Sequence, residues 1–465
     1  MTTVMHPHRQ AGTPAAAPTD RRPWDMLMVC TAVYILTAVA RLHQLYRPVA
    51  ALKPTLIFAL LGLIVLFLDK NRIRSLRELK DPTSRLVLFI MVWATAGVPF
   101  GIYGSHSLFY LYDEAYKVLA LFLLVAAAVR NVQDLRRLFY VYGAGIVWLA
   151  LTALARKHGG MRLGSATYDA NDLGMVLVSA LPIGIYALTR ARGTLSKIGG
   201  IVALLVLVTA LVETDSRGGF LAFAGVVIYT LFFLKGVKPQ WRMVTAVAVI
   251  GVLAMSATGT YWERMRTTFD SKDDYNRTSI TGRIEIWKRG MGYMFGHPIF
   301  GVGVDNFMTA EGRSEIIVER QARGQGTKWS VAHSSWVQAG AEMGIPGLIA
   351  VVGLFVMAFF RLRKLARLAS SKGDMSSEAR EAAGLGAALM GVMVGLSISM
   401  SFITQAFGYA PYASLGLVAG LLKVARLHGL DTEVRNNRAT LARAGQRARV
   451  RPPLSAAGPV LGPPR

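Results

Sequence analysis

Arg217 occupies a position where a cation could bind a substrate anion. It lies in the run Thr214-Asp215-Ser216-Arg217-Gly218-Gly219-Phe220-Leu221, where a long apolar stretch begins. A helix that starts there places free backbone N–H groups beside the guanidinium, and together they can hold one anion. The alternatives are a side chain that reaches lipid headgroups or one that pairs with Asp215 or Glu213.

His333 precedes another apolar stretch, in Ala332-His333-Ser334-Ser335-Trp336. Imidazole exchanges a proton near neutral pH, so His333 is a candidate general base. Ser334 either caps the following helix or contacts a substrate. A histidine at a helix entrance can also be an ordinary surface side chain, and its position alone leaves both interpretations open.

A short amphipathic helix is predicted over residues 283–295. Its apolar residues recur at spacings of three and four: Ile284, Trp287, Met291 and Met294. Arg283 and Arg289 lie on other faces of this helix. Each is a candidate for binding either a substrate anion or a lipid phosphate.

Weaker signals surround these residues. Residues 168–172 are typical of a helix entrance capped by Asn171 or Asp172, where Asp169 could line a cavity and contact substrate. Asp113 and Lys117 either serve a function within a span or form a helical i, i+4 pair. The run 301–306 lacks the features of a nucleotide-binding loop and is predicted to be a turn.

The composition requires a membrane to surround most of the chain. Hydrophobic residues make up 53% of the sequence, charged residues 17%, and the mean hydropathy is +0.40. These values exclude an ordinary soluble domain. About twelve apolar stretches are long enough to be spans: 23–40, 50–68, 86–103, 109–129, 138–155, 171–189, 198–213, 217–234, 242–259, 334–360, 382–402 and 409–425.

This division predicts five parts of the chain. Residues 1–22 form a disordered N-terminal tail without a signal peptide, 23–260 hold the first nine spans, and 261–333 form one long loop. Residues 334–425 hold the last three spans, and 426–465 form a basic, disordered tail. Cys30, the only cysteine, falls within the first span and is predicted to be a small core residue.

The positive charge is sorted by loop. The formal net charge is +25, which in a soluble protein would suggest a nucleic-acid partner. Here one side of the twelve-span arrangement collects the basic residues: Lys70, Arg72, Arg74, Arg77, Lys80, Arg85, Arg130, Arg136, Arg137, Arg190, Arg192, Lys197, Arg361, Arg363, Lys364 and Arg367. The positive-inside rule makes that side cytoplasmic, which places the long loop outside. We therefore expect anionic lipids as partners, and no nucleic acid.

Three of these places together resemble the O-antigen ligase family, which shares a domain with polysaccharide polymerases and with oligosaccharyltransferases that modify pilin-like proteins. The family pattern is a His followed by Asn, Ser or Gln, then nine residues, then Gly-x-x-Gly/Thr/Tyr. It is met by His333-Ser334, nine residues to Met343, and Gly344-Ile345-Pro346-Gly347. The family element Arg-x-x-x-Leu is met by Arg217 to Leu221. The run from Arg283 to Trp287 is similar to a family loop pattern with an essential arginine.

The resemblance, which covers residues 200 to 360, implies an all-α, GT-C-like enzyme of the bacterial inner membrane, with short helices in a large periplasmic loop. Such an enzyme moves a glycan from a polyprenyl (undecaprenyl) diphosphate carrier to an acceptor hydroxyl by an inverting route, without a metal or cofactor. It implies that Arg217 and Arg283 stabilise the leaving diphosphate and that His333 is the base. Arg289, Ser334 and Asp169 are expected to contact substrate.

Two further expectations concern packing and the acceptor. Gly344 and Gly347 are expected to let their helix pack closely against a neighbour or a lipid tail. A ligase would use lipid A-core as the acceptor, a polymerase a growing glycan, and a protein ligase a Ser or Thr hydroxyl. A transporter of lipid-linked sugars is less favoured, because it predicts charges deep in several spans and the notable charges here lie near span ends and in the loop.

Overall fold

The computed structural model describes residues 23–157, 162–165, 167–234, 238–257, 259–266, 279–325, 329–367 and 376–430. All regular secondary structure within these residues is helical, as predicted. The two predicted tails lie outside the described residues, apart from 426–430 at the end of the last helix.

The helices follow one another along the chain with short connections. The first group is α1 (Met26–Ala38), α2 (Arg47–Ala51), α3 (Pro54–Leu68), α4 (Pro82–Ala96), α5 (Gly104–Tyr110), α6 (Tyr116–Ala128) and α7 (Val132–Ala155). The second group is α8 (Ala170–Arg190), α9 (Thr194–Glu213), α10 (Arg217–Phe232), α11 (Pro239–Ser256) and α12 (Gly259–Arg266). The last is α14 (Arg283–Gly296), α15 (Phe307–Arg313), α16 (Glu315–Ala322), α17 (Ser335–Ala366), α18 (Ser377–Met400) and α19 (Tyr409–Leu427).

The chain is a membrane protein by helix length and composition. Among the described residues, six helices are long and apolar enough to cross a bilayer, namely α7, α8, α9, α17, α18 and α19. Shorter apolar helices occupy five more of the predicted spans: α1, α3, α4, α10 and Arg242–Met255 within α11. The remaining predicted span, 109–129, coincides with the end of α5, a π-helical turn and α6. Each predicted span thus coincides with helical structure, while the count of twelve crossings stays a prediction.

Proline and small polar residues set where several helices begin. Proline is the first residue of α3, α4 and α11, where its missing N–H would have no intrahelical partner. Asp81 caps α4 by accepting from the backbone N–H groups of Thr83 and Ser84 at 2.9 and 3.4 Å. Such signals explain why the helix order could be predicted from local sequence.

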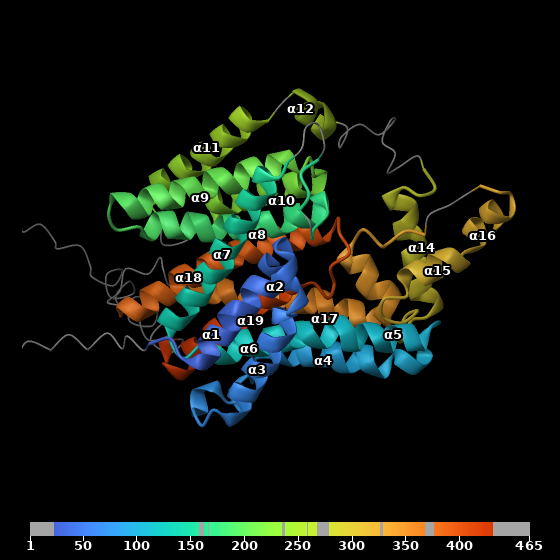
Figure 1. The fold of residues 1–465 in the computed structure, drawn as a ribbon, viewed down its shortest axis with the longest axis horizontal. Helices are drawn as coiled ribbons and strands as arrows, with labels where there is room; N and C mark the ends of the chain where they lie inside the picture. Colours follow the sequence, from blue (N-terminus) through green and yellow to red (C-terminus); the bar gives the residue numbers. More distant parts are fainter. Residues whose placement is uncertain are drawn as a thin grey trace, which may run out of the picture.

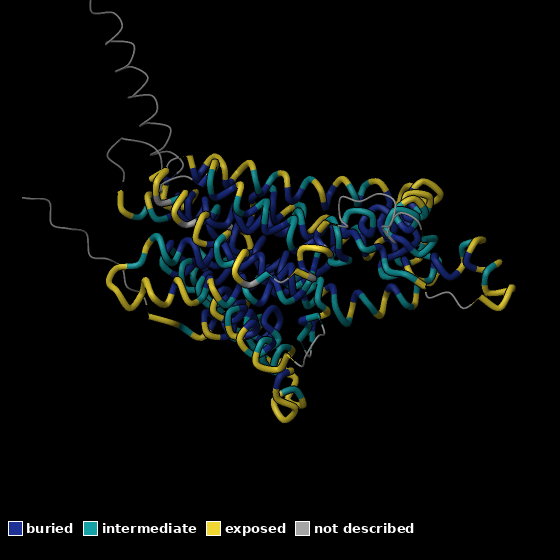
Figure 2. The backbone as a smooth tube through the Cα atoms, turned by 90° about the horizontal axis from the view of Figure 1, so that it is seen from above, coloured by how far each residue is buried: buried dark blue, intermediate teal, exposed yellow. Residues whose placement is uncertain are grey.

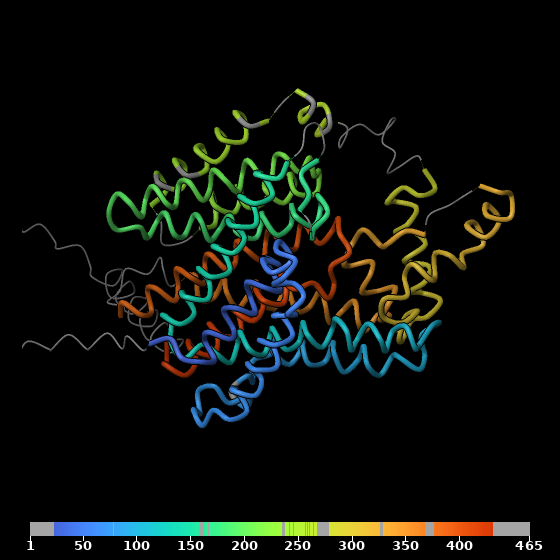
Figure 3. Tube along the Cα trace, viewed as in Figure 1, coloured from blue at the N-terminus to red at the C-terminus, as the bar shows by residue number. Residues whose placement is uncertain are grey.

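The C-terminal helices form the interior of the bundle. α18 packs against α8 and α10, and α19 packs against α6. Figure 3 shows α18 between the N-terminal helices and the α8–α10 group. The dark-blue tube in Figure 2 follows the interior, and exposed residues lie on the outer surface and the projecting tips. Glycines let neighbouring helices approach closely. A Cβ at Gly416 of α19 would lie 3.0 Å from the carbonyl oxygen of Phe122 in α6.

The bundle has two distinct ends (Figure 1). The start of α1, the end of α19 and the α3–α4 connection, which holds several predicted basic residues, lie at one end, on the left of the view. Helices α14, α15 and α16 lie at the other, which we call the loop end. Helices α14, α15 and α16 of the predicted long loop therefore lie away from the α3–α4 connection.

The predicted span over 334–360 coincides with α17, and this helix is broken at Gly344. Gly344 has φ 70° and ψ −170°, values outside the helical region, and Pro346 follows two residues later. Trp336 and Phe355 would lie about 28 Å apart along a straight helix. Their ring centroids are 5.4 Å apart. The first part of α17 therefore folds back along the second part, and His333 lies deeper in the bundle than the break.

Candidate functional site

The beginning of α10 forms one wall of the candidate site. Ser216 caps the helix by accepting from the backbone N–H of Gly219 at 3.1 Å. Arg217 is the first helical residue and is half-buried, and Leu221, the last residue of its motif, lies one turn further and is also half-buried. The prediction that Arg217 opens a helix is confirmed. Glu213, one of its two predicted ion-pair partners, forms an ion pair with Lys157.

Asn171 of α8 fixes the position of this helix start. The Ser216 hydroxyl donates to the Asn171 side-chain oxygen at 3.1 Å, and Arg162 donates to the same oxygen at 3.0 Å. Arg162 also donates to the carbonyl oxygen of Thr214 at 3.0 Å. These bonds connect the turn before α10 to the first turn of α8.

The predicted cap of α8 is wrong, because Asp169 is the capping residue. Its side chain accepts from the backbone N–H groups of Asn171 and Asp172 at 2.7 and 2.8 Å. Asp169 itself is exposed. Capping leaves Asn171 free to bond across to Ser216, and it explains Asp169 without a bound substrate.

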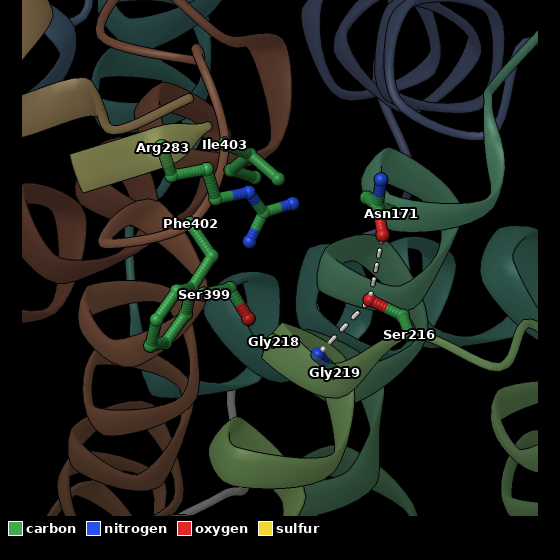
Figure 4. Close-up of a pocket in the computed structure, with 8 residues that line it drawn as sticks. All are labelled: Asn171, Ser216, Gly218, Gly219, Arg283, Ser399, Phe402 and Ile403. Carbon is green, nitrogen blue, oxygen red and sulfur yellow. Dashed lines mark hydrogen bonds between the residues drawn. The ribbon is translucent and has the colours of Figure 1, made fainter. Parts of the chain in front are cut away.

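Arg283 faces the start of α10 across a narrow pocket (Figure 4). The pocket lies between α8, α10, α14 and the end of α18, and its lining includes Asn171, Ser216, Arg283 and Phe402. The Arg283 side chain points into the space that Asn171 and Ser216 border on the opposite side. Because Arg217 sits between the lining residues Ser216 and Gly218, both predicted arginines belong to this part of the structure.

His333 is held next to the same pocket by its backbone. Its N–H donates to the Thr404 hydroxyl at 2.8 Å, and Thr404 follows the lining residue Ile403. The preceding carbonyl, that of Ala332, accepts from the Trp287 indole one turn after Arg283 at 3.1 Å. His333 has φ 49°, a left-handed conformation that is uncommon for a residue with a side chain. The two contacts place His333 between α14 and the segment that lines the pocket.

Residues 401–408, which connect α18 to α19 and which we call the crossover segment, join the site to α17. The Ser335 hydroxyl donates to the carbonyl oxygen of Ile403 at 2.8 Å and accepts from the N–H of Gln405 at 3.0 Å. The Gln338 side chain accepts from the N–H of Ala406 at 3.0 Å. Ser334 caps α17, as one of its two interpretations requires.

The sequence did not single out the crossover segment, most of which lies between the predicted spans 382–402 and 409–425. The available signal was polar residues, Thr404 and Gln405, between two long apolar helices. Gln405 also forms a side-chain hydrogen bond with Asp172 of α8. The segment therefore touches α8, α17 and the pocket, and it orders the residues around His333.

The Arg289 side chain is bonded to other residues of the protein. Its guanidinium donates to both carboxylate oxygens of Glu311 in α15 at 2.8 and 2.7 Å, and to the carbonyl oxygen of Ile280 at 3.0 Å. The hydrogen bonds that Arg289 donates to Glu311, reinforced by the carboxylate's charge, raise the pKa of Arg289 against the effect of burial. This geometry favours a role in holding α14 to α15, and the predicted substrate contact of Arg289 gains no support from it.

The amphipathic helix over 283–295 is confirmed as α14, but its buried face differs from the predicted stripe. The buried residues are Ile286, Gly290 and Met294, whereas Met291 is exposed. A Cβ at Gly290 would lie 3.0 Å from the Phe307 ring and would overlap Val337. The helix is rotated because this glycine face fits against α15 and α17.

The glycines of the His333 motif serve the break in α17 rather than packing against another helix or a lipid tail. A Cβ at Gly344 would lie 2.6 Å from the carbonyl oxygen of Pro298, and the N–H of Ile345 donates to that oxygen at 2.9 Å. Gly347 faces Met343 of its own helix. The predicted turn over 301–306 is confirmed, and the segment from Pro298 into this turn crosses α17 at the break.

Charged residues also lie where α5 joins α6. Asp113 and Lys117 form the i, i+4 ion pair at 2.8 Å that was one of their two interpretations. They belong to a stretch that includes the π-helical turn η5 (Leu111–Ala115). No group of three or more His, Cys, Asp or Glu side chains suitable for a metal ion occurs in the part of the chain that the structure describes.

Six helices of the described residues are long and apolar enough to cross a membrane, which makes this chain a membrane protein. Arg283 lines one pocket between its helices, and Arg217 and the backbone of His333 lie next to residues that line the same pocket. Residues 202–352 match the family model described as O-Antigen ligase. The matched segment contains Arg217, Arg283, His333 and Gly344. The resemblance to the O-antigen ligase family is thereby confirmed over this segment, and it indicates a glycosyltransferase-like enzyme. No curated protein matches the chain.

Proposed function

We propose that this protein is a ligase that transfers a glycan from a polyprenyl diphosphate carrier to a hydroxyl of lipid A-core. The observation that carries the proposal is the convergence of Arg283 and the start of α10 on one pocket, within the segment that matches the O-antigen ligase family. A polymerase that uses the same chemistry is the second candidate, because the matched domain is shared with polysaccharide polymerases. The site would face the periplasm from the inner membrane.

Arg217 and Arg283 can stabilise the leaving group. As the bond between the anomeric carbon and the diphosphate oxygen breaks, its electron pair goes to the diphosphate, whose negative charge increases. Arg217 and Arg283 would stabilise that charge, and the N–H groups of the first turn of α10 would add to the effect. Two fixed guanidinium groups supply this stabilisation without a metal ion.

His333 can take the proton of the acceptor hydroxyl. An acceptor hydroxyl would attack the anomeric carbon from the side opposite the diphosphate, so that the configuration inverts. Its proton would pass to His333, whose backbone is fixed by the crossover segment and α14. Arg217 and Arg283 would act on the donor, and His333 on the acceptor.

Conservative arginine variants test the proposal. A guanidinium binds a diphosphate through two parallel hydrogen bonds, which lysine cannot reproduce. We expect Arg217→Lys and Arg283→Lys each to lower transfer by about 10- to 100-fold, the effect of losing a charge-assisted hydrogen bond. The measurement is product formation by purified protein in detergent with a polyprenyl-diphosphate glycan and lipid A-core.

Arg323→Lys is the matched control, because the Arg323 side chain is exposed directly after α16 and its ion pair with Glu319 is long, at 3.4 Å. Its transfer rate should equal that of the wild type. Full activity in both site variants would contradict the proposal and would favour arginines that merely reach lipid headgroups.

A further inference from the structure

Three hydrogen-bond donors lie close together where α7, α8 and α18 pack against one another. Arg190 is the last residue of α8, and its guanidinium carbon lies 5.8 Å from the centre of the Tyr186 ring in the same helix. The Tyr186 ring centre lies 6.2 Å from that of Tyr140 in α7. Among the residues that the structure describes, neither the Arg190 guanidinium nor the two tyrosine hydroxyls have a hydrogen-bond or ion-pair partner. Three donors therefore share one place that lacks a protein acceptor.

The Arg190 guanidinium lies against the backbone of α18. A Cβ at Gly384 of α18 would overlap the guanidinium and would lie 3.5 Å from the Tyr186 ring. The glycine thus makes room for the arginine beside the aromatic ring. Because the side chain already lies along a ring and a helix, it loses less freedom on binding than an arginine that extends into solvent.

The charges around these donors favour an anion. Arg136 of α7 and Glu381 of α18 form an ion pair at 2.6 Å, so the carboxylate already has its partner. The charges of Arg136, Glu381 and Arg190 all act on the hydroxyls of Tyr140 and Tyr186. With two arginines against one glutamate, this cluster has a net positive charge.

The donors lie where lipid headgroups would surround the protein. Helices α7, α8 and α18 are each long and apolar enough to cross a bilayer. Arg190 ends α8, and Arg136 lies in the second turn of α7, so both are near the end of a candidate span. Both also belong to the predicted basic side of the chain. The anion closest at hand there is the phosphate of a phospholipid.

We infer that Arg190, Tyr140 and Tyr186 bind the phosphate group of an anionic phospholipid. The guanidinium and the two hydroxyls would donate to the phosphate oxygens. Phosphatidylglycerol has a negative phosphate and no cation in its headgroup, so it complements the positive cluster better than zwitterionic phosphatidylcholine does. The inference does not depend on the proposed glycan transfer, since none of these residues lines the pocket that contains Arg283.

Two substitutions test the inference by different routes. Arg190→Gln removes the charge, whereas Gly384→Ala keeps every donor and places a Cβ where the guanidinium lies. We expect each to raise the Kd for phosphatidylglycerol about tenfold, the effect of losing one hydrogen bond to a charged group. Tyr140→Phe, which keeps the ring, should raise it about threefold. The measurement is native mass spectrometry of purified full-length protein in detergent, titrated with phosphatidylglycerol.

Two variants serve as matched controls. Arg192 is exposed two residues beyond Arg190, so Arg192→Gln removes the same charge from the neighbouring surface. A Cβ at Gly386 would lie 3.4 Å from the Leu365 side chain, so Gly386→Ala adds a methyl group to α18 away from the donors. Both variants should bind phosphatidylglycerol with the wild-type Kd.

Two further ligands identify what is bound. Phosphatidylcholine should bind more weakly than phosphatidylglycerol, and millimolar inorganic phosphate should not displace bound phosphatidylglycerol. Wild-type Kd values for both Arg190→Gln and Gly384→Ala would overturn the inference. Equal losses in Arg190→Gln and Arg192→Gln would also overturn it, because they would indicate attraction to the basic surface as a whole. Displacement of the lipid by inorganic phosphate would assign the donors to free phosphate instead.

Discussion

Glu311 shows how one residue holds the loop end together. Its carboxylate is 1% exposed, bonds both sides of the Arg289 guanidinium and accepts from the Tyr293 hydroxyl at 2.8 Å. Removing this carboxylate leaves a largely buried cation without its partner. We expect Glu311→Ala to lower the free energy of unfolding by about 3 to 5 kcal/mol, measured by thermal or denaturant unfolding in detergent.

Glu285→Ala provides the comparison on the neighbouring face of α14. Glu285 pairs with Lys288 at 2.7 Å, but both side chains are well exposed. Solvent screens such a pair, so this variant should change the stability by less than about 1 kcal/mol. Equal effects of the two variants would contradict the structural role assigned to Arg289 and Glu311.

At the residue scale, the sequence predicted where each candidate residue lies relative to a helix start better than it predicted which residues it contacts. Arg217 and Arg283 each begin a helix, and His333 stands just before one, because capping residues and apolar runs are local signals. The partner of Arg289 lies 22 positions away in another helix, and Thr404 lies 71 positions from His333. Such contacts depend on how helices pack, which no local pattern encodes.

At the element scale, Gly344 determines the shape of α17. Its φ of 70° with ψ −170° is essentially restricted to glycine, and a Cβ there would meet the backbone of Pro298 and Ile299. We expect Gly344→Ala to cost at least about 1 to 3 kcal/mol of stability and to abolish transfer, because the break positions His333.

Gly292→Ala is the control for this substitution. Gly292 lies in α14, and a Cβ there would meet nothing within 4 Å. Since alanine favours a helix over glycine, the variant should gain about 0.5 to 1 kcal/mol and keep its activity. A Gly344→Ala protein with wild-type stability would contradict the broken-helix geometry.

Hydropathy could not predict this break, because the apolar run continues on both sides of it. The same limit applies to α14, which was predicted as a helix with the wrong buried face. Periodicity identifies a helix, whereas the face that is buried depends on its neighbours. In α14 that face is defined by Gly290 and its contacts with Phe307 and Val337.

At the scale of the whole molecule, the order of the helices was predictable and the orientation in the membrane stays a prediction. Single cysteines test it, since the native Cys30 is fully buried. Val318→Cys on α16 and Leu76→Cys in the α3–α4 connection replace exposed side chains at opposite ends of the bundle. A membrane-impermeant thiol reagent should label Val318→Cys, and not Leu76→Cys, in cells with a permeabilised outer membrane. The reverse pattern would place His333 on the cytoplasmic side.

The central claim is that Arg217, Arg283 and His333 form one transfer site, in which the histidine takes the proton of the acceptor. His333→Asn tests this most directly, because asparagine tolerates the left-handed backbone at φ 49° and lacks the basic imidazole. Transfer and donor binding are measured separately on the purified variant, with polyprenyl-diphosphate glycan and lipid A-core. The account predicts that transfer falls by about 10² to 10⁴ while donor binding is retained. Wild-type transfer by His333→Asn would contradict it.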